Sequence, residues 1–446
     1  MASLARKALT FFGDPKGGVS LLLVFLFAVL MGITALAVDL VRYFGAKSAI
    51  LQATHVSSEL ISKNSLFVPE NTLRRVSETA AGFELGGLQN GSLLTKTAVL
   101  KDLTFSYEEE RKTLNVALTA EIPTTLMSFF SFSENLQVSA EIQSGLYTDP
   151  VELVIVLDRS LGAASSGKLG IAQAALTVFL DQLMRLPRKE GAEQIAVGLI
   201  PFGNAYTNVS PYKSWVEAGA WPTEYPPEVP GSVTWSGLLE EQRWCVDVRE
   251  GSAGMSSLSP ALQKFPLILD LQMEVDPETG EALYSVATDP ACSDNPVLPL
   301  QRTIPAVKQA ISETTGHGDA MPGRALVWAE RVLSADWAAD WNIEAGLPAA
   351  NLAETSKMVL MIINSEAASI EDQALLADKC QALKAEGVTL HVLDYSESES
   401  LQAALRICAN PAHAYREISD DGTLAKGLTE IARSLLKVRI TAVSYK

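Results

Sequence analysis

The spacing of hydrophobic positions changes along this 446-residue chain, and each pattern predicts a different structure. Residues 19–38 (VSLLLVFLFAVLMGITALAV) are a run without a charged side chain. A run of about 20 apolar residues is long enough for a helix to cross a hydrocarbon core of ~30 Å. We therefore expect a transmembrane helix at 19–38, preceded by an N-terminal tail at 1–18.

Residues 39–92 are predicted to form a helical stalk. No proline occurs between Asp39 and Asn64, and apolar residues recur there at roughly helical spacing. These residues are Phe44, Ile50, Leu51, Val56, Leu60 and Ile61. An amphipathic helix needs a partner for its apolar stripe, which is either the protein's own ectodomain or a second protein.

Residues 93–150 alternate apolar and polar side chains, in runs such as VLKDLTFSY, LNVALTAEI and LQVSAEIQSG. A period of two is typical of strands with one buried face, and the polar EEER between the first two runs favours a turn. We expect a small antiparallel β-subdomain of three or four strands. No catalytic constellation falls within it.

From Val151 to Lys446, patterns of buried strands alternate with patterns of amphipathic helices, the last helix being expected at 422–440. VELVIVLD and KMVLMIIN are continuous apolar runs, which are typical of parallel strands buried on both faces. The alternation predicts an α/β domain with an open, Rossmann-type sheet, in which ligands bind at the carboxyl ends of strands. Asp158 stands at such an end.

A long irregular insertion at about 203–300 breaks this rhythm. It contains eleven prolines and four of the seven tryptophans. A loop of this length in a compact domain is usually functional or has a small core of its own. The tryptophans are Trp215, Trp221, Trp235 and Trp244. Exposed, they would form a binding face, but we expect them to be buried in place of regular structure. Cys245 and Cys292 both lie here, so a disulfide between them would tie the insertion down.

The formal net charge of −17 argues against nucleic acid as a partner, because basic residues are needed to neutralise phosphates. An acidic chain is also repelled by an anionic membrane surface, so contact with a membrane requires hydrophobic insertion.

Basic residues before the span set its expected orientation. Arg6, Lys7 and Lys16 precede it against one acid, Asp14, which favours a cytoplasmic N-terminus. The alternative for this segment is a signal peptide cleaved after Ala37. All four cysteines follow the span, in an oxidising compartment, and none has zinc-site spacing, so disulfides are expected.

Several segments match one family in order and spacing. They are KGGVSLLLVFLF…LAVDLVR at the N-terminus, IPTTLMSFF, AVGLIPFGNAYTNV, CSDNPVLPL, and the closing KCQALKAEGVTLHVLDY…LRICAN…AYREI. Together they resemble the TadG type of Tad (Flp) pilus-assembly proteins. The resemblance implies a TadE/TadG-like stalk at 39–92, a von Willebrand factor A-like domain at 151–446, and a disulfide between Cys380 and Cys408.

In that family an intact A domain holds a metal-ion-dependent adhesion site made of Asp-x-Ser-x-Ser, a threonine on a later loop and an aspartate at a strand end. Asp158 and Ser160 match the first two positions, whereas Gly162, Ala320 and Asn364 occupy the other three. Mg²⁺ prefers near-octahedral oxygen ligands that include carboxylates. We therefore expect a remnant of the site and no cofactor. If a metal bound, it would be Mg²⁺ on Asp158 and Ser160.

Other candidate chemistry is weaker. Ser165 or Ser166 could replace the missing second serine across a flexible loop. GHGDAMPG resembles a phosphate loop but lacks the Gly-Lys-Ser/Thr ending. The four histidines show no paired spacing, and His391, in the middle of a predicted strand, is expected in the core. The chain is therefore predicted not to be an enzyme, since no hydrolase or redox constellation is present.

The resulting prediction is a single-pass protein of the bacterial inner membrane with a periplasmic C-terminal domain. It would take part in Tad pilus assembly by contact with other Tad components or pseudopilins, without a nucleic-acid or small-molecule partner. Processing after Gly18, as in prepilins, would place Leu23 where a glutamate is usual, so a permanent anchor is favoured. The alternative is a surface or pilus-associated adhesin that binds through the reduced metal site after release at Ala37.

Overall fold

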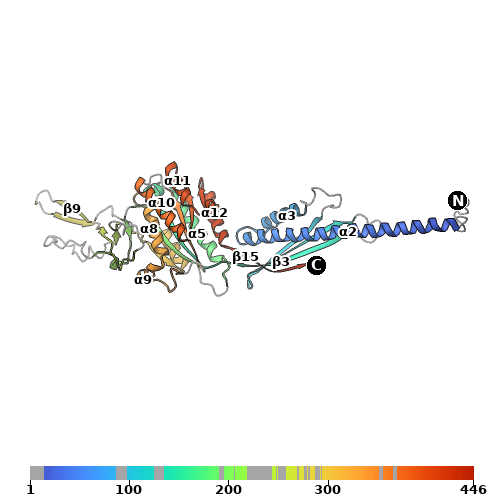
Figure 1. The fold of residues 1–446 in the computed structure, drawn as a ribbon. Helices are drawn as coiled ribbons and strands as arrows, with labels where there is room; N and C mark the ends of the chain where they lie inside the picture. Colours follow the sequence, from blue (N-terminus) through green and yellow to red (C-terminus); the bar gives the residue numbers. More distant parts are fainter. Residues whose placement is uncertain are drawn as a thin grey trace. The chain divides into compact units, whose positions relative to one another are not determined.

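A computed structural model shows that the chain folds into two units (Figure 1). Unit 1 comprises Met1–Tyr147 and Leu436–Lys446, and unit 2 comprises Thr148–Leu435. The structure describes residues 15–86, 98–124, 135–189, 195–204, 206–217, 244–247, 249, 258–268, 271–275, 279, 282–286, 292, 294–350, 355–364 and 369–445. Most of the predicted N-terminal tail, Trp221 and Trp235 lie outside the described residues.

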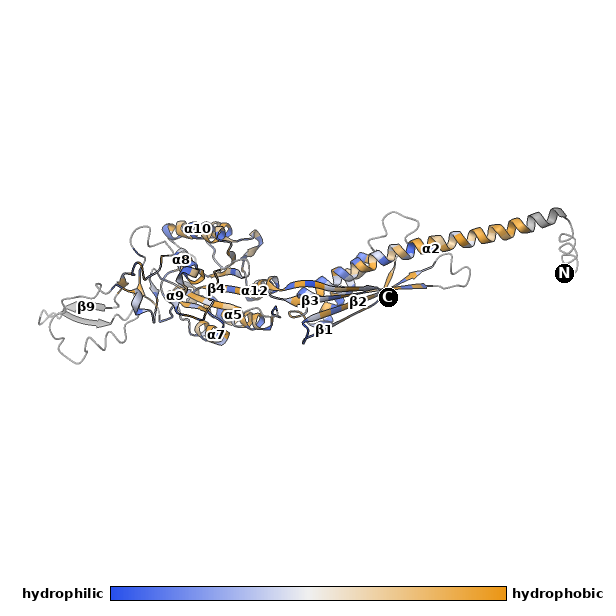
Figure 2. Cartoon of the chain, turned by 60° about the horizontal axis from the view of Figure 1, so that its bottom comes forward, coloured by the Kyte–Doolittle hydropathy of each residue, from blue (hydrophilic) through white to orange (hydrophobic). Residues whose placement is uncertain are grey.

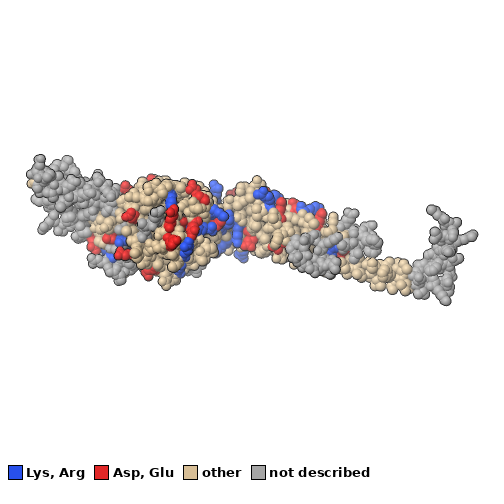
Figure 3. Space-filling view, turned by 90° about the horizontal axis from the view of Figure 1, so that it is seen from above, with Lys and Arg blue, Asp and Glu red and all other residues tan. Residues whose placement is uncertain are grey.

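Unit 1 begins with helix α2 (Pro15–Asn64). Between Leu22 and Leu30 its large side chains are exposed and apolar, and its most apolar window has a mean hydropathy of 2.5. Figure 2 shows this stretch as hydrophobic, and Figure 3 shows no charged side chain on it. Among the described residues, α2 is the one helix long and apolar enough to cross a membrane, in agreement with the expected span.

Farther along, α2 becomes a packing helix of unit 1. Ile50, Ala53 and Ile61 recur on one side and are fully buried against strands β2 and β3. The hydroxyls of Ser58 and Ser144 lie 2.9 Å apart across this contact. Helix α3 (Glu70–Gly86) packs beside it on strand β1. The part of the stalk's apolar stripe around Ile50 and Ile61 is therefore covered by the sheet of unit 1, whereas Phe44 is 59% exposed.

The sheet of unit 1 has the order β1-β2-β3-β15 and is antiparallel throughout. Its strands are β1 (Val99–Glu108), β2 (Thr113–Pro123), β3 (Asn135–Tyr147) and β15 (Lys437–Tyr445). Along β2, buried and half-buried residues alternate over the whole strand. This alternation is the period of two that the sequence shows, with the buried side chains facing the helices.

The C-terminal segment differs from the expected helix at 422–440. Helix α12 (Asp421–Leu435) ends earlier, and the chain continues as β15. The sequence KVRITAVSY is rich in β-branched residues, which favour a strand over a helix. Residues 436–446 thus belong to unit 1, whereas the sequence analysis placed them in the A-like domain.

Unit 2 contains a six-stranded sheet of order β11-β5-β4-β12-β13-β14. The strands are β4 (Val151–Asp158), β5 (Ala196–Phe202), β11 (Leu298–Gln301), β12 (Ser356–Ile363), β13 (Thr389–Asp394) and β14 (Tyr415–Glu417). All run parallel except β11, which is antiparallel to β5. Every residue of β4 is buried, as its continuous apolar run predicts.

Helices cover both faces of this sheet (Figures 1 and 2). One layer contains α5 (Lys168–Arg185), α7 (Ile304–Ser312) and α12. The other contains α8 (Pro322–Leu333), α10 (Ile370–Ala385) and α11 (Glu399–Cys408). The disulfide Cys380–Cys408 joins α10 to α11, the pair that the family resemblance implies. The predicted α/β class and the open, largely parallel sheet are confirmed.

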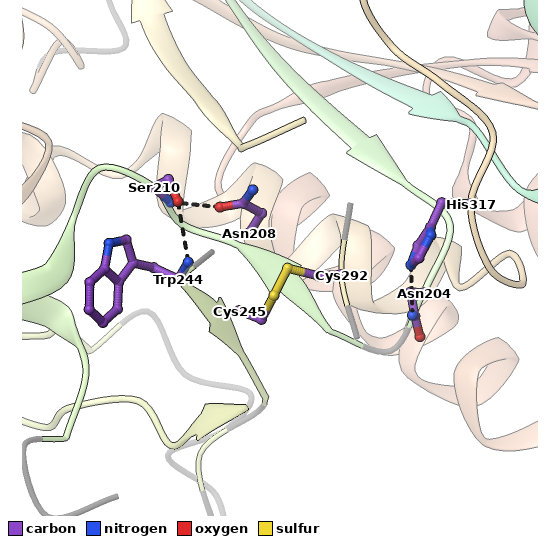
Figure 4. Close-up of a disulfide and its surroundings, with 7 residues drawn as sticks. All are labelled: Asn204, Asn208, Ser210, Trp244, Cys245, Cys292 and His317. Carbon is purple, nitrogen blue, oxygen red and sulfur yellow. Dashed lines mark hydrogen bonds between the residues drawn. A yellow bond between two sulfur atoms is a disulfide. The ribbon is translucent and has the colours of Figure 1, made fainter. Parts of the chain in front are cut away.

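The insertion has a small sheet and an aromatic core. Its described strands are β6 (Thr207–Asn208), β7 (Cys245–Val246), β8 (Leu267–Ile268), and the hairpin β9 (Leu271–Val275) and β10 (Ala282–Val286). The expected disulfide Cys245–Cys292 fastens β7, and Ser210 accepts a hydrogen bond from the Trp244 amide beside it (Figure 4). Trp215 is buried, with its ring centroid 4.7 Å from that of Trp341, and Trp244 is half-buried.

Candidate functional site: the strand-end edge of unit 2

The candidate site lies where the parallel strands of unit 2 end, here called the strand-end edge. Leu157 on β4 pairs with Ile362 on β12, and Ile363 pairs with Asp394 on β13. Asp158 and Asp394 therefore stand at one level on the two strands that flank β12. The loops that leave these strands meet at this edge.

Asp158 is fully buried, and each oxygen of its carboxylate accepts a main-chain hydrogen bond. Oδ1 accepts from the Ser160 amide at 2.9 Å, and Oδ2 accepts from the Asn364 amide at 2.8 Å. The Asn364 side-chain amide donates to the Asp158 carbonyl at 3.4 Å. The carboxylate thus connects the loop after β4 to the loop after β12.

The hydroxyls after Asp158 bond to their own helical turn. Ser160 caps the short helix α4 (Leu161–Ser165), because its Oγ accepts from the Ala163 amide at 3.3 Å. Ser165 donates to the Gly162 carbonyl, and Ser166 donates to the Ala163 carbonyl, at 3.2 Å each. A Cβ on Gly162 would meet only the Ser160 Oγ, at 3.9 Å, so a serine would fit there.

The loop that precedes α8 contributes apolar contact and close packing. Ala320 is 3% exposed and belongs to the hydrophobic core of unit 2. Gly318 has a φ of +59°, and a Cβ there would overlap the Gly203 carbonyl oxygen. The His317 amide donates to the Arg159 carbonyl at 2.9 Å. The glycines of GHGDAMPG therefore allow two loops to touch, and the loop is not a phosphate cradle.

The five positions of the expected remnant lie on loops that meet at the strand-end edge. They offer one carboxylate, one hydroxyl that caps a helix, and the Asn364 Oδ1, a buried oxygen without a hydrogen-bond partner among the described residues. No group of three His, Cys, Asp or Glu able to hold a metal occurs in the described part of the chain. Mg²⁺ prefers near-octahedral oxygen coordination, and the one carboxylate at these positions already accepts two main-chain hydrogen bonds.

A second aspartate, Asp394, repeats the geometry of Asp158 and was missed from the sequence. Its Oδ1 accepts from the Ser396 amide at 2.7 Å, and its Oδ2 accepts from the Tyr415 hydroxyl at 2.9 Å. Burial raises the pKa of Asp394. The available signal was the sequence VTLHVLD, a buried strand that ends in aspartate in the same way as VELVIVLD.

Two cations at this edge also bond internally. Lys168 donates to the Tyr395 carbonyl at 3.2 Å, and its ammonium lies 5.7 Å from the centre of the Tyr395 ring. Arg159 is 2% exposed and donates to the Asn295 Oδ1 at 3.3 Å. Burial lowers the pKa of Arg159 to about 10. Each of these two charged side chains is bonded to a neighbouring loop.

The exposed side chains at this edge include two large apolar residues, here called the apolar rim. Leu161 is 59% exposed at the start of α4, and Ile370 is 87% exposed at the start of α10. Asp372 holds α10 against α8 by accepting from the Gly323 amide at 2.9 Å and the Arg324 amide at 3.0 Å. Leu161 and Ile370 are therefore exposed at the starts of two helices whose first turns are hydrogen-bonded within unit 2.

No family model matches the chain, and no curated protein matches it. Similar solved structures include the pilus adhesin SpaC from Lactobacillus rhamnosus GG, with 10% identity, a TM-score of 0.35, and coverage of 76% of this chain and 36% of SpaC. A von Willebrand factor type A protein from Catenulispora acidiphila has 15% identity, a TM-score of 0.31, and coverage of 76% and 51%. The von Willebrand factor domain of the type V pili tip protein Mfa5 from Porphyromonas gingivalis has 9% identity, a TM-score of 0.34, and coverage of 65% and 95%.

The chain covers less than two thirds of the length of SpaC and of the Catenulispora protein. Overlays with TM-scores of 0.31 to 0.35 are too weak to support an argument about this chain. The fold is therefore described from the strand order and strand directions of unit 2.

Proposed function

We propose that the chain is a non-enzymatic, membrane-anchored component of the Tad/Flp pilus machinery, of the TadG type, that works through protein–protein contact. The strand-end edge carries this proposal. The carboxylates of Asp158 and Asp394 and the Ser160 hydroxyl are bonded inside the fold, whereas Leu161 and Ile370 face solvent. An edge built in this way offers a partner apolar contact in place of a metal or a reactive group.

Continuity of α2 supports a permanent anchor over release as an adhesin. The proposed cleavage position, Ala37, lies inside this helix, and its neighbours Ala35 and Asp39 are each 2% exposed. Cleavage there would cut a helix turn that is packed in unit 1. An inner-membrane anchor with a cytoplasmic N-terminus places unit 2 in the periplasm, where its two disulfides are stable.

The partners we propose are other Tad components or pseudopilins, with no cofactor in the contact. The test is a Leu161→Lys/Ile370→Lys variant of the full chain, scored by pilus assembly on cells. The matched control is Ile407→Lys, since Ile407 is 65% exposed at the far end of α11, away from the strand-end edge. Loss of pili with the rim variant alone is the expected result, and normal assembly by a stably expressed rim variant would contradict the proposal.

Metal dependence is tested separately by titration calorimetry of the full chain in detergent with Mg²⁺ and Mn²⁺. The full chain is used because α2 and α3 bury one face of the unit 1 sheet. We expect no binding heat up to millimolar metal. Micromolar binding that disappears in Asp158→Ala would instead favour the adhesin that binds through a reduced metal site.

A further inference from the structure

The sheet of unit 1 leaves strand β15 open along its outer edge. Among the described residues, β15 pairs only with β3, and eight of its nine residues are exposed. Ile440, Val443 and Tyr445 are between 41% and 47% exposed. An edge strand with unpaired main-chain groups and exposed apolar side chains is a template for another strand.

The opposite edge, β1, is covered at one end and open at the other. Arg74 of α3 donates to the Leu103 carbonyl at 2.8 Å and lies 5.2 Å from the centre of the Phe105 ring. No side chain of α3 is bonded in this way to the strand between Ser106 and Glu108, where Ser106 is exposed. The same sheet therefore has a second accessible edge near the β1–β2 turn.

The directions of the strands make these two edges compatible. Each of the four strands is antiparallel to its neighbour, so β1 and β15 also run in opposite directions. A second copy that is displaced sideways without rotation brings its β1 antiparallel to β15 of the first. Both copies of α2 then point the same way, as a shared membrane requires.

The register adds charge complementarity to this pairing. Arg439 pairs with Gly145, Gly145 with Thr113, and Thr113 with Glu108. Arg439 and Glu108 thus stand at one level on the two outer strands, and Glu108 also forms an ion pair with Arg111 of its own chain at 3.5 Å. Continued in register, the sheet places Arg439 of one copy opposite Glu108 of the next. Opposite charges on directly opposed positions stabilise antiparallel pairs.

The next basic residue fits the same register. Lys437 is exposed at the start of β15 and falls at the level of the β1–β2 turn, which contains the acidic Glu109 and Glu110 and the basic Arg111 and Lys112. A homotypic β15–β15 pair would instead bring two basic strand starts together when both membrane helices point the same way. The pairing of Arg439 with Glu108 therefore favours β1 of a second copy as the occupant of the β15 edge.

We propose that copies of this chain associate side by side in the membrane, with β15 of one copy extending the sheet through β1 of the next. The contact is heterologous, so it repeats from copy to copy and forms a row. Anchoring in one membrane keeps the edges at similar height and raises their effective concentration, which allows a short strand pair to form.

Cysteine cross-linking in membranes tests the pairing directly. Ser106 and Ala442 stand at one level, because Ser106 pairs with Asn115, Asn115 with Gln143, and Gln143 with Ala442. Full chains with Ser106→Cys and with Ala442→Cys are expressed together and oxidised mildly. We expect a disulfide dimer in the mixture and none with either variant alone. The native cysteines are buried in disulfides and do not compete.

Charge exchange on this background makes the test specific. Arg439→Glu should reduce the cross-linked fraction at least about tenfold, and Glu108→Arg in the partner that carries Ser106→Cys should restore it. A dimer formed by Ala442→Cys alone would indicate β15–β15 pairing and overturn the proposal. Absence of the mixed dimer in chains with normal thermal unfolding would overturn it as well, because the fold would then be intact and the edge unpaired.

Discussion

The strand-end edge of unit 2 and the β15 edge of unit 1 differ in whether their polar groups have hydrogen-bond partners within the chain. At the strand-end edge, Asp158 and Asp394 have the sequence signature of ligand-binding positions, yet their oxygens accept bonds from the protein itself. Strand β15 has no such signature, yet its outer edge pairs with no other described strand. A sequence motif therefore identifies the edge whose polar groups are already hydrogen-bonded. The edge with unpaired main-chain groups is recognised only from the strand order of the sheet.

This comparison predicts that substitutions at the two edges have different effects. At the strand-end edge, Asp158 and Gly318 hold loops together, so Asp158→Ala and Gly318→Ala should lower stability equally with and without Mg²⁺. At the β15 edge, side chains face solvent in a single copy, so changes should affect association and leave unfolding almost unchanged.

The largest effect is expected for Gly318→Ala. Its left-handed φ and the Gly203 carbonyl leave no room for a Cβ, so unit 2 should lose about 3 kcal/mol or more of unfolding free energy. Gly162→Ala is the matched control on the same edge, because a Cβ there meets only the Ser160 Oγ at 3.9 Å. Denaturant unfolding of the full chain in detergent compares the two. Equal stability of both variants would show that the two loops are not closely packed.

Asp158→Ala should be nearly as severe. It removes the acceptor of two buried amides, those of Ser160 and Asn364, and should cost about 3 kcal/mol. The loss should be the same with Mg²⁺ and with a chelator, because the carboxylate acts as a structural acceptor. Ser165→Ala, which removes one exposed hydroxyl, is the control. If Mg²⁺ stabilises the wild type but not Asp158→Ala, Asp158 would be a metal ligand and this prediction would be wrong.

Asn364→Asp sharpens the same question by restoring the second carboxylate of the family pattern. The new charge is buried beside Asp158, and we expect a loss of about 2 kcal/mol at pH 7. Repulsion raises the pKa of the new group in the folded state, so the loss should shrink as the pH is lowered through that pKa.

Asn364→Ala is the uncharged control, and the pH dependence of thermal unfolding distinguishes the two variants. Adding Gly162→Ser to Asn364→Asp should make stability respond to Mg²⁺, since a hydroxyl fits at that position. If unfolding of this double variant does not depend on Mg²⁺, the two changes do not restore a metal site. The buried Ala320, which stands at the family's threonine position, would then be the remaining missing ligand.

The burial of His391 in unit 2 can be tested by measuring how the unfolding free energy depends on pH. Burial lowers its pKa from 6.5 to about 4, with smaller effects of His413 and Arg416. Between these two values the unfolded chain binds a proton that the folded chain does not, so unfolding free energy falls as pH falls. This group should contribute a loss of about 1 to 2 kcal/mol between pH 7 and pH 5. His391→Gln should remove this contribution to the pH dependence of the unfolding free energy. His55→Gln, a change of an exposed histidine in unit 1, should leave the pH dependence unchanged.

Sequence patterns predicted most of this fold because burial sets their period. The continuous apolar VELVIVLD and the alternating strands of unit 1 follow directly from two-sided and one-sided burial. The first four residues of KVRITAVSY were predicted as the end of a helix, and the strand was missed because its partner, β3, is almost 300 residues away in the sequence and no local pattern indicates such pairing. The family motif predicted which positions form the candidate site, namely 158, 160, 162, 320 and 364. It did not predict their hydrogen bonds, because the donors to Asp158 and Ser160 are main-chain amides, which a pattern of side chains does not encode.

The smallest effect on stability is expected at the open edge. Val443→Lys in β15 replaces an exposed side chain, and it should change the unfolding free energy by less than about 0.5 kcal/mol. The same change places a charge inside the proposed β15–β1 pair, near the level of Phe105 and Arg74 of the next copy. It should therefore lower the yield of the Ser106→Cys/Ala442→Cys cross-link strongly, whereas Val178→Lys, a change of a similarly exposed valine on α5, should not. A large loss of stability in Val443→Lys would mean that β15 is buried within a single chain, and the contrast between the two edges would then fail.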